Sequence, residues 1–194
     1  MDQLVICGHS FGGMTALQVA KEDSRPQACL GLDSWVWVIH EEMDRKEWFL
    51  TIPQCQVLSE GFSDACESVY NYNSIKSIQT MIQNNKHPAK EFAIINEINH
   101  FHQCDLLILL PIETFLISGT RWSINPGDLY KLNTQVCMRL LNKIGMNACE
   151  PKYIEDFIAR YEKRHLEYLT EYTQGQDGPD LINGDDIEAE PLLN

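Results

Sequence analysis

The sequence predicts an α/β domain in which a parallel β-sheet is flanked by helices. Short apolar runs alternate along the chain with longer stretches of helical periodicity, an order typical of parallel strands joined by helical crossovers. The chain has 194 residues, of which 44% are hydrophobic, so it is long enough to build the core of a single domain. The longest apolar run, residues 106–110, stops at Pro111 and is far shorter than the roughly 20 residues of a membrane-spanning helix.

Four short apolar runs are the expected strands. Residues 4–7 run directly into a glycine, and residues 28–32 end immediately before Asp33. Residues 54–59 follow a loop rich in tryptophan and charged side chains, and residues 92–95 form the fourth run. Helix-forming stretches in two of the three intervals between these runs favour one parallel sheet.

The stretches between and after these runs have helical patterns. Residues 11–21 contain helix formers, and residues 66–84 place their large aliphatic side chains on one side of a helix. Further helices are expected at residues 105–117, 129–144 and 151–172, the last of which begins with a proline in its first turn.

The segment that joins the first strand to the first helix is the most informative part of the chain. It reads Gly8-His9-Ser10-Phe11-Gly12, which is the pattern Gly-x-Ser-x-Gly between a strand and a helix. This context is that of a nucleophile elbow, in which a sharp, strained turn holds the serine hydroxyl above the sheet. We therefore expect Ser10 to be a nucleophile and the backbone N–H of Phe11 to be an oxyanion donor. The two glycines are expected to avoid collisions at the tight turn.

The elbow is a feature of the α/β-hydrolase fold, where several strands precede it and the loop after the third strand supplies a second oxyanion donor. Only three residues precede the first strand here. We therefore expect a partial α/β-hydrolase domain over residues 1–173 that begins at the elbow and lacks the N-terminal strands. Residues 174–194 are expected to be an acidic, disordered tail. Because loss of one oxyanion donor typically slows an enzyme by about 100- to 1000-fold, the chain can carry a triad and be nearly inactive.

Composition excludes some partners. The formal net charge of −13, with 15 basic residues among 28 acidic ones and no basic stripe, argues against nucleic acid. Seven cysteines, most of them in apolar segments and without a Cys-x-x-Cys pair, indicate buried free thiols and no zinc site. No metal and no cofactor are therefore expected. Free thiols favour a reducing compartment such as the cytoplasm, but no targeting region is present to decide the localisation.

A nucleophilic serine requires a base and an acid, which in this fold follow it in the order Asp or Glu, then His. Asp33 ends the second strand and Asp64 follows the third, so position alone leaves both open as the acid. His100 and His102 follow the fourth strand and compete as the base. His9, inside the elbow, is expected to pack beside the serine and shape the turn.

Four segments, taken together, resemble one known family. They are Gly8-His9-Ser10-Phe11-Gly12-Gly13, Gly31-Leu32-Asp33-Ser34-Trp35, Ile52-Pro53-Gln54 and His102-Gln103. They are similar to the platelet-activating factor acetylhydrolases of the lipoprotein-associated phospholipase A2 type, and the resemblance extends from residue 1 to about residue 145. It implies a calcium-independent serine esterase that removes short or oxidised sn-2 acyl groups from phospholipids such as 1-alkyl-2-acetylglycerophosphocholine.

The resemblance also implies roles for single residues. It favours Asp33, which lies 23 residues after Ser10, over Asp64 as the acid. It favours His102, which is followed by glutamine, over His100 as the base, and it places Trp35 in the acyl pocket.

Two departures from the family pattern are visible. The family has a Phe-containing stretch ending in Asp-Phe after His-Gln, whereas Cys104-Asp105-Leu106 follows here at once. The interval of 69 residues from Asp33 to His102 indicates an insertion near residues 71–88.

The alternatives are another lipase or carboxylesterase that uses Asp64, and a truncated, non-catalytic remnant. A phospholipid substrate also raises the prospect of peripheral contact with a lipid surface. The apolar stretch at residues 108–117, with Trp122 beyond it, is the candidate for this contact, and the competing interpretation is a helix buried against the sheet.

Overall fold

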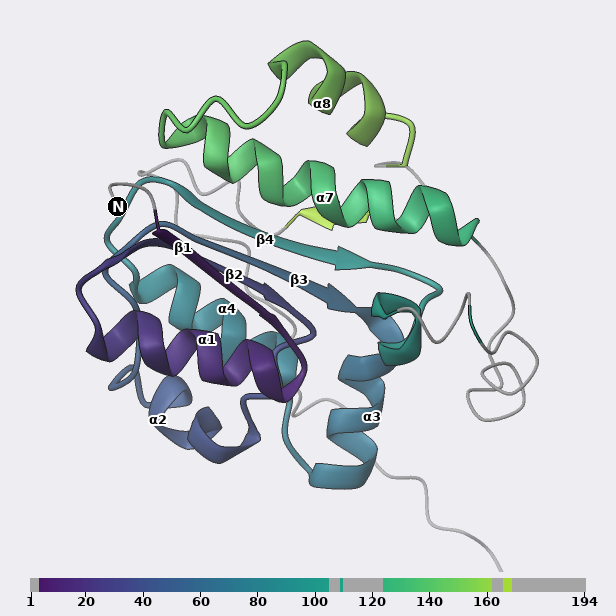
Figure 1. Cartoon of the computed structure of the whole chain (residues 1–194). Helices are drawn as coiled ribbons and strands as arrows, with labels where there is room; N and C mark the ends of the chain where they lie inside the picture. Colours follow the sequence, from purple (N-terminus) through teal and green to yellow (C-terminus); the bar gives the residue numbers. More distant parts are fainter. Residues whose placement is uncertain (1–3, 105–108, 110–123, 162–165, 169–194) are drawn as a thin grey trace, which may run out of the picture.

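The computed structural model describes residues 4–104, 109, 124–161 and 166–168, and Figure 1 shows their arrangement. Within these residues five strands form one sheet in the order β1-β2-β3-β4-β5. β1 to β4 are parallel to one another, and β5 pairs antiparallel with β4. The strands are β1 Leu4–His9, β2 Pro26–Leu32, β3 Gln54–Ser59, β4 Lys90–Ile95 and β5 Leu166–Tyr168.

Helices cover both faces of the sheet. In Figure 1, α1, α2 and α4 lie on one face, and α7 with α8 lies on the other. The parallel strands follow their sequence order, so right-handed crossovers place the connecting helices on a single face. The helices are α1 Phe11–Glu22, η1 Trp37–Ile39, α2 His40–Asp44, α3 Glu60–Tyr70, α4 Ser74–Asn84, η2 His100–Gln103, α7 Pro126–Lys143 and α8 Pro151–Ile158.

The core consists of two layers, one on each face of the sheet, and β4 contributes to both. Phe92 and Ile94 pack into the layer below α1 and α4, whereas Ala93 and Ile95 pack into the layer below α7. This alternation follows from the two-residue period of a strand. Because both faces are buried, residues 92–95 of this strand are all apolar, as the sequence pattern suggested.

The α/β class and the four parallel strands predicted from sequence are confirmed, and β3 has the predicted bounds. The single helix predicted over residues 66–84 is wrong. Two helices occupy this region: α3 ends at Tyr70, and Asn71, which caps its C-terminus, has a left-handed φ of 53°. α4 then begins after Asn73, whose side chain accepts a hydrogen bond from the N–H of Lys76 at 2.8 Å. Asparagine suits both positions, because it tolerates the left-handed region and caps helix N-termini.

The helix predicted over residues 151–172 is also wrong in its second half. α8 ends at Ile158, and Leu166–Tyr168 form β5 instead. The pairing of β5 satisfies backbone groups at the edge of β4, a gain that helical periodicity in the sequence does not reveal.

Several predicted features lie outside the described residues. They are most of the helix at 105–117, most of the lipid-contacting stretch at 108–122 and the tail at 174–194. In the part of the chain that the structure describes, no helix is long and apolar enough to span a membrane.

All seven cysteines are free thiols, but their predicted burial is only partly correct. Cys29 is buried on β2, and burial together with the neighbouring Cys7 raises its pKa to about 12. Cys7 itself is exposed, because β1 is the edge strand of the described sheet.

Candidate active site

Ser10 lies in a strained turn between β1 and α1. Its φ of 59° and ψ of −126° are far from helix or strand values, and such a conformation costs about 1–3 kcal/mol. Hydrogen bonds to the end of β2 hold the turn: the Ser10 N–H donates to the Leu32 carbonyl at 3.0 Å, and the Ser10 carbonyl accepts from the Trp35 N–H at 3.0 Å. The strand, turn and helix of the predicted elbow are therefore present.

The glycines around Ser10 permit this turn in different ways. A side chain at Gly8 would collide with the backbone of Gly12, and one at Gly13 would collide with Ser34. At Gly12 a Cβ would meet nothing within 4 Å among the described residues. The predicted steric role is thus confirmed for Gly8 but not for Gly12, and Gly13 has the second close approach.

Asp33 is fully buried at the carboxyl end of β2, with a left-handed φ of 46°. Its Oδ1 accepts the Ser59 N–H at 2.6 Å, and its Oδ2 accepts the Ser59 hydroxyl at 2.7 Å. These two bonds fix the orientation of the carboxylate.

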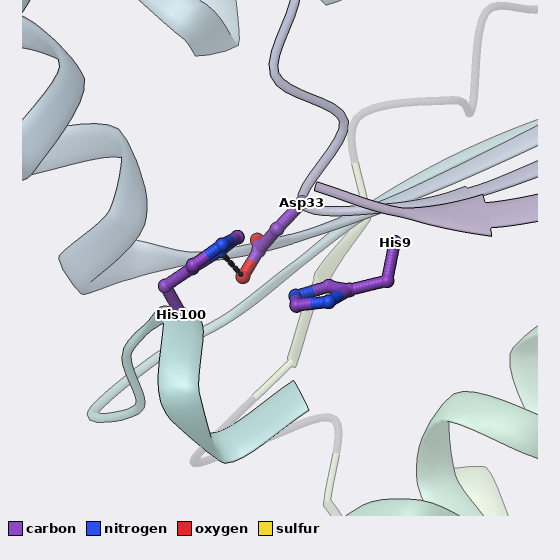
Figure 2. A group of neighbouring side chains, drawn as sticks. All are labelled: His9, Asp33 and His100. Carbon is purple, nitrogen blue, oxygen red and sulfur yellow. Dashed lines mark hydrogen bonds and ion pairs between the residues drawn. The ribbon is translucent and has the colours of Figure 1, made fainter. Parts of the chain in front are cut away.

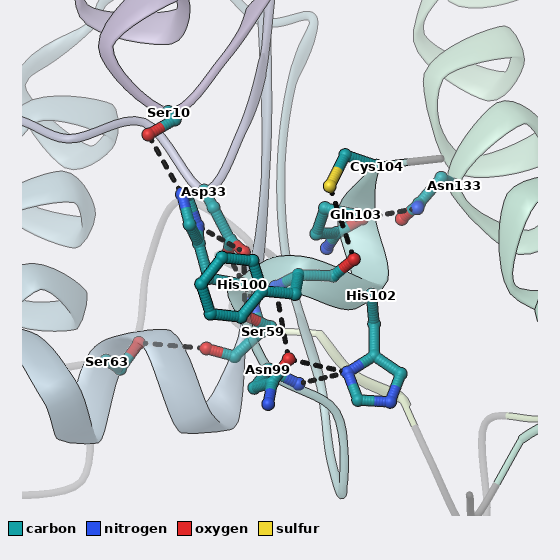
Figure 3. A network of polar contacts seen from close by, with 11 residues as sticks. Ser10, Asp33, Ser59, Ser63, Asn99, His100, His102, Gln103, Cys104 and Asn133 are labelled. Carbon is teal, nitrogen blue, oxygen red and sulfur yellow. Dashed lines mark hydrogen bonds and ion pairs between the residues drawn. The ribbon is translucent and has the colours of Figure 1, made fainter. Parts of the chain in front are cut away.

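His100 lies between Ser10 and Asp33 (Figure 3). Its Nε2 is 2.9 Å from the Ser10 Oγ, and its Nδ1 is 3.2 Å from the Asp33 Oδ2. A carboxylate can only accept hydrogen bonds, so Nδ1 carries the proton and Nε2 is left to accept from the serine hydroxyl. The geometry is that of a serine, a base and an orienting acid in series.

The resemblance favoured His102 as the base, but the structure brings His100 and not His102 to Ser10. His102 is 2% exposed, and its Nδ1 lies 2.6 Å from the Asn99 Oδ1 (Figure 3). Burial lowers its pKa. Both histidines belong to η2, in which residues two positions apart point in directions about 120° apart around the axis. Only one of them can therefore reach the serine.

A signal for His100 is present in the sequence. Starting from His100, the following residues include Phe101 and end at Asp105, which is a Phe-containing stretch ending in aspartate. The family pattern has such a stretch after its histidine, and it is missing after His102. With His100 in place of His102, this departure from the family pattern becomes smaller.

The remaining candidates separate clearly. Asp64 is an exposed residue of α3, so the structure brings Asp33 and not Asp64 to the histidine. Phe11 opens α1, and as the first helical residue its N–H has no acceptor within the helix. Trp35 is half-buried nearby, with its ring centroid 6.1 Å from that of Phe11.

Trp35 belongs to an aromatic cluster that comprises Phe11, Trp35, Trp37 and Tyr70. The Trp37 and Tyr70 centroids lie 5.9 and 5.6 Å from that of Trp35. Phe11, Trp37 and Tyr70 are exposed. An apolar surface therefore borders the nucleophile.

Figure 2 shows His9, Asp33 and His100, whose ligand-type atoms lie within 4.8 Å of one another. This is the one such group among the described residues. Both nitrogens of His100 and both oxygens of Asp33 already take part in the hydrogen bonds above. The hydrogen-bonded series of Ser10, His100 and Asp33 therefore accounts for these atoms better than a metal centre does, since a metal would have to displace the bonds.

Comparisons with known proteins identify relatives of the chain. Residues 1–150 match the family described as platelet-activating factor acetylhydrolase, isoform II. A platelet-activating factor acetylhydrolase of Cavia porcellus is 28% identical over 152 residues, which cover 78% of this chain and 30% of that protein. One of Bos taurus is 40% identical over 42 residues, which cover 22% of this chain and 10% of that protein. The chain thus spans less than a third of either relative, but the family match covers most of the chain. The chain belongs to the platelet-activating factor acetylhydrolase isoform II family.

Proposed function

We propose that this chain carries the catalytic centre of a serine esterase that hydrolyses the short or oxidised sn-2 acyl ester of phospholipids such as platelet-activating factor. The observation that carries this proposal is the unbroken hydrogen-bonded series from Ser10 through His100 to Asp33. The names of the relatives support the substrate class. Since the triad supplies both nucleophile and base, no step of the proposed mechanism requires calcium.

The first half-reaction acylates Ser10. The Ser10 Oγ attacks the ester carbonyl while His100 Nε2 takes its proton, and Asp33 stabilises the imidazolium that forms. The Phe11 N–H donates to the developing oxyanion. His100 then transfers the proton to the leaving glycerol oxygen, and the lysophospholipid departs.

The second half-reaction returns the enzyme to its starting state. A water molecule attacks the acyl-enzyme carbonyl, and His100 takes the proton of that water. When the intermediate collapses, His100 returns the proton to the Ser10 Oγ, and the short carboxylic acid is released. The base therefore has to keep one orientation through four proton transfers.

The aromatic cluster is the proposed wall of the acyl pocket: Phe11 belongs to the elbow itself, and the Trp35 N–H donates to the Ser10 carbonyl. Its exposed members also offer an apolar contact with a lipid surface, where tryptophan and tyrosine are favoured. With a net charge of −13, such contact depends on apolar insertion and not on anionic lipid.

Two other functions are less well supported. A lipase that uses Asp64 would need this exposed side chain to reach His100, which Asp33 already contacts. A non-catalytic remnant would not need to keep a serine, a histidine and a buried aspartate in hydrogen-bonding order.

The test uses the 194-residue chain and two readouts, hydrolysis of 1-alkyl-2-acetylglycerophosphocholine and covalent labelling by a fluorophosphonate. We expect Ser10→Ala and His100→Ala each to reduce both rates by at least about 1000-fold. His102→Ala should reduce them much less, because His102 does not contact Ser10.

Labelling that persists in Ser10→Ala, or that is lost in His102→Ala but kept in His100→Ala, would contradict the proposed triad. A phosphatidylcholine with a long sn-2 chain serves as the matched substrate. Hydrolysis of that lipid as fast as the acetyl substrate would contradict the proposed substrate class.

A further inference from the structure

We infer that His9 is a positioning residue, which holds the His100 ring in the plane where it bridges Ser10 and Asp33. His9 closes one face of that ring, and Phe62 closes the other. This inference rests on the proposed function of the site, because the role assigned to His9 and Phe62 is to keep the proposed base, His100, aligned.

The evidence is the stacking of three rings from three different elements. The His9 ring, at the end of β1, lies 4.5 Å from the His100 ring with an interplanar angle of 28°. The Phe62 ring, from α3, lies 4.3 Å from the His100 ring with an interplanar angle of 20°. One face of an imidazole can accommodate only one ring at such distances, so His100 lies between the two. Figure 2 shows His9 and His100 side by side with Asp33.

The stacking restrains a motion that the hydrogen bonds of the triad do not. Bonds at Nδ1 and Nε2 fix two atoms on the edge of the ring, and the ring can still rock about the line that joins them. Contacts on both faces oppose that rocking. Because His100 comes from η2, a turn of only four residues, the neighbouring elements have to supply this restraint.

The charge state of His9 suits this position. Its pKa is lowered, first by burial and then by the nearby His100, while Asp33 and the His100 backbone act in the opposite direction. Its Nε2 is buried, and no described residue forms a hydrogen bond with that atom. A neutral ring can lie against the imidazolium of His100 without repulsion, whereas a charged ring would oppose its formation.

The test compares His9→Phe, which keeps an aromatic face, with His9→Ala, which removes it. The readout is the exchange rate of the His100 Nδ1 proton in the NMR spectrum of the 194-residue chain, so no turnover is needed. We expect His9→Ala to speed this exchange, and to slow fluorophosphonate labelling of Ser10, by about 10-fold each. His9→Phe should stay within about threefold of the unmodified chain in both measurements.

A second variant, Phe62→Leu, removes the flat face on the other side and retains apolar volume in the core. It should speed the exchange in the same way as His9→Ala, and it provides the readout if His9→Ala does not fold. Unchanged exchange in the folded variants, or an effect of His9→Phe as large as that of His9→Ala, would overturn the inference. A failure of the proposed function would show separately, as ester hydrolysis that does not depend on Ser10.

Discussion

Ser10 and Asp33, the two residues at the ends of the proposed triad, share an unusual backbone conformation. Both have a positive φ, 59° for Ser10 and 46° for Asp33, although neither is glycine. Each residue follows a parallel strand directly, and neighbouring strands hold it in place through backbone hydrogen bonds. Strain of this kind persists only where the surrounding structure enforces it, and it gathers at functional sites.

The roles of the two candidate acids can be separated by isosteric changes. Asp33→Asn keeps the shape of the side chain but removes its charge, so the His100 tautomer and the imidazolium both lose their stabilisation. We expect kcat for the acetyl ester to fall by about 10,000-fold. Asp64→Asn is the matched control, and its kcat should stay within about twofold because surface changes of this kind are nearly neutral. The reverse pattern in steady-state kinetics would support the lipase that uses Asp64.

At the scale of elements, the proposed base, His100, depends on how the short turn η2 is anchored. The Asn99 side chain accepts a hydrogen bond from the Phe101 N–H at 3.1 Å and also contacts His102. The Ile98 carbonyl accepts from the Gly61 N–H at 2.9 Å, which ties the start of this turn to α3. The histidine predicted as the base thus helps to hold the turn that presents the other one.

The cap of η2 is expected to matter for both stability and chemistry. Asn99→Ala should lower the free energy of unfolding by about 1 kcal/mol and slow fluorophosphonate labelling of Ser10, because the base loses its support. Asn73→Ala removes the comparable cap of α4, where Asn73 accepts from Lys76. It should cost a similar amount in urea unfolding and leave labelling unchanged. Equal effects of the two variants on labelling would refute a special role for the η2 cap.

At the scale of the whole molecule, a buried ion pair fastens α7 to the sheet. Glu91 on β4 is 1% exposed, and its carboxylate accepts from Arg139 at 2.6 Å and from Lys143, both on α7. β4 and α7 also contribute residues to one apolar layer. Charge and burial together therefore hold the helix that covers the face opposite to α1.

Removing one partner from this cluster should be costly. We expect Arg139→Ala to lower the free energy of unfolding by about 3 kcal/mol, since it weakens the compensation of a buried charge. Arg45→Ala is the matched control, because it removes an arginine from exposed ion pairs with Glu41 and Glu47. This substitution should lower the free energy of unfolding by less than about 1 kcal/mol. Urea unfolding measures both values. Similar losses would show that the Glu91 cluster is no stronger than a surface pair.

Stability is expected to fall in mild acid. Burial lowers the pKa of both His9 and His102 below the ordinary value of 6.5. Near pH 6.5 and just below it, these histidines bind more protons in the unfolded chain than in the folded chain. The free energy of unfolding therefore decreases as the pH falls below about 6.5. Urea unfolding at about pH 7.5 and 5.5 should show the decrease. His102→Asn should make it smaller, and an unchanged decrease in that variant would contradict a contribution from His102.

The sequence by itself determined the features that arise from local geometry. The elbow, the four parallel strands and the position of Asp33 at a strand end could be inferred, because each depends on a short run of neighbouring residues. The carboxyl ends of parallel strands meet at one edge of a sheet, so order along the chain also indicated that Ser10, Asp33 and a histidine would converge.

The tertiary structure decided the features that depend on direction and on distant partners. His100 and His102 are two residues apart, and only the orientation of η2 shows that His100 reaches Ser10. The break at Asn71 and the pairing of β5 with β4 likewise arise from packing and from hydrogen bonds between distant segments. Periodicity describes which residues share a face of an isolated element, but it contains no information about how that element is turned relative to its neighbours.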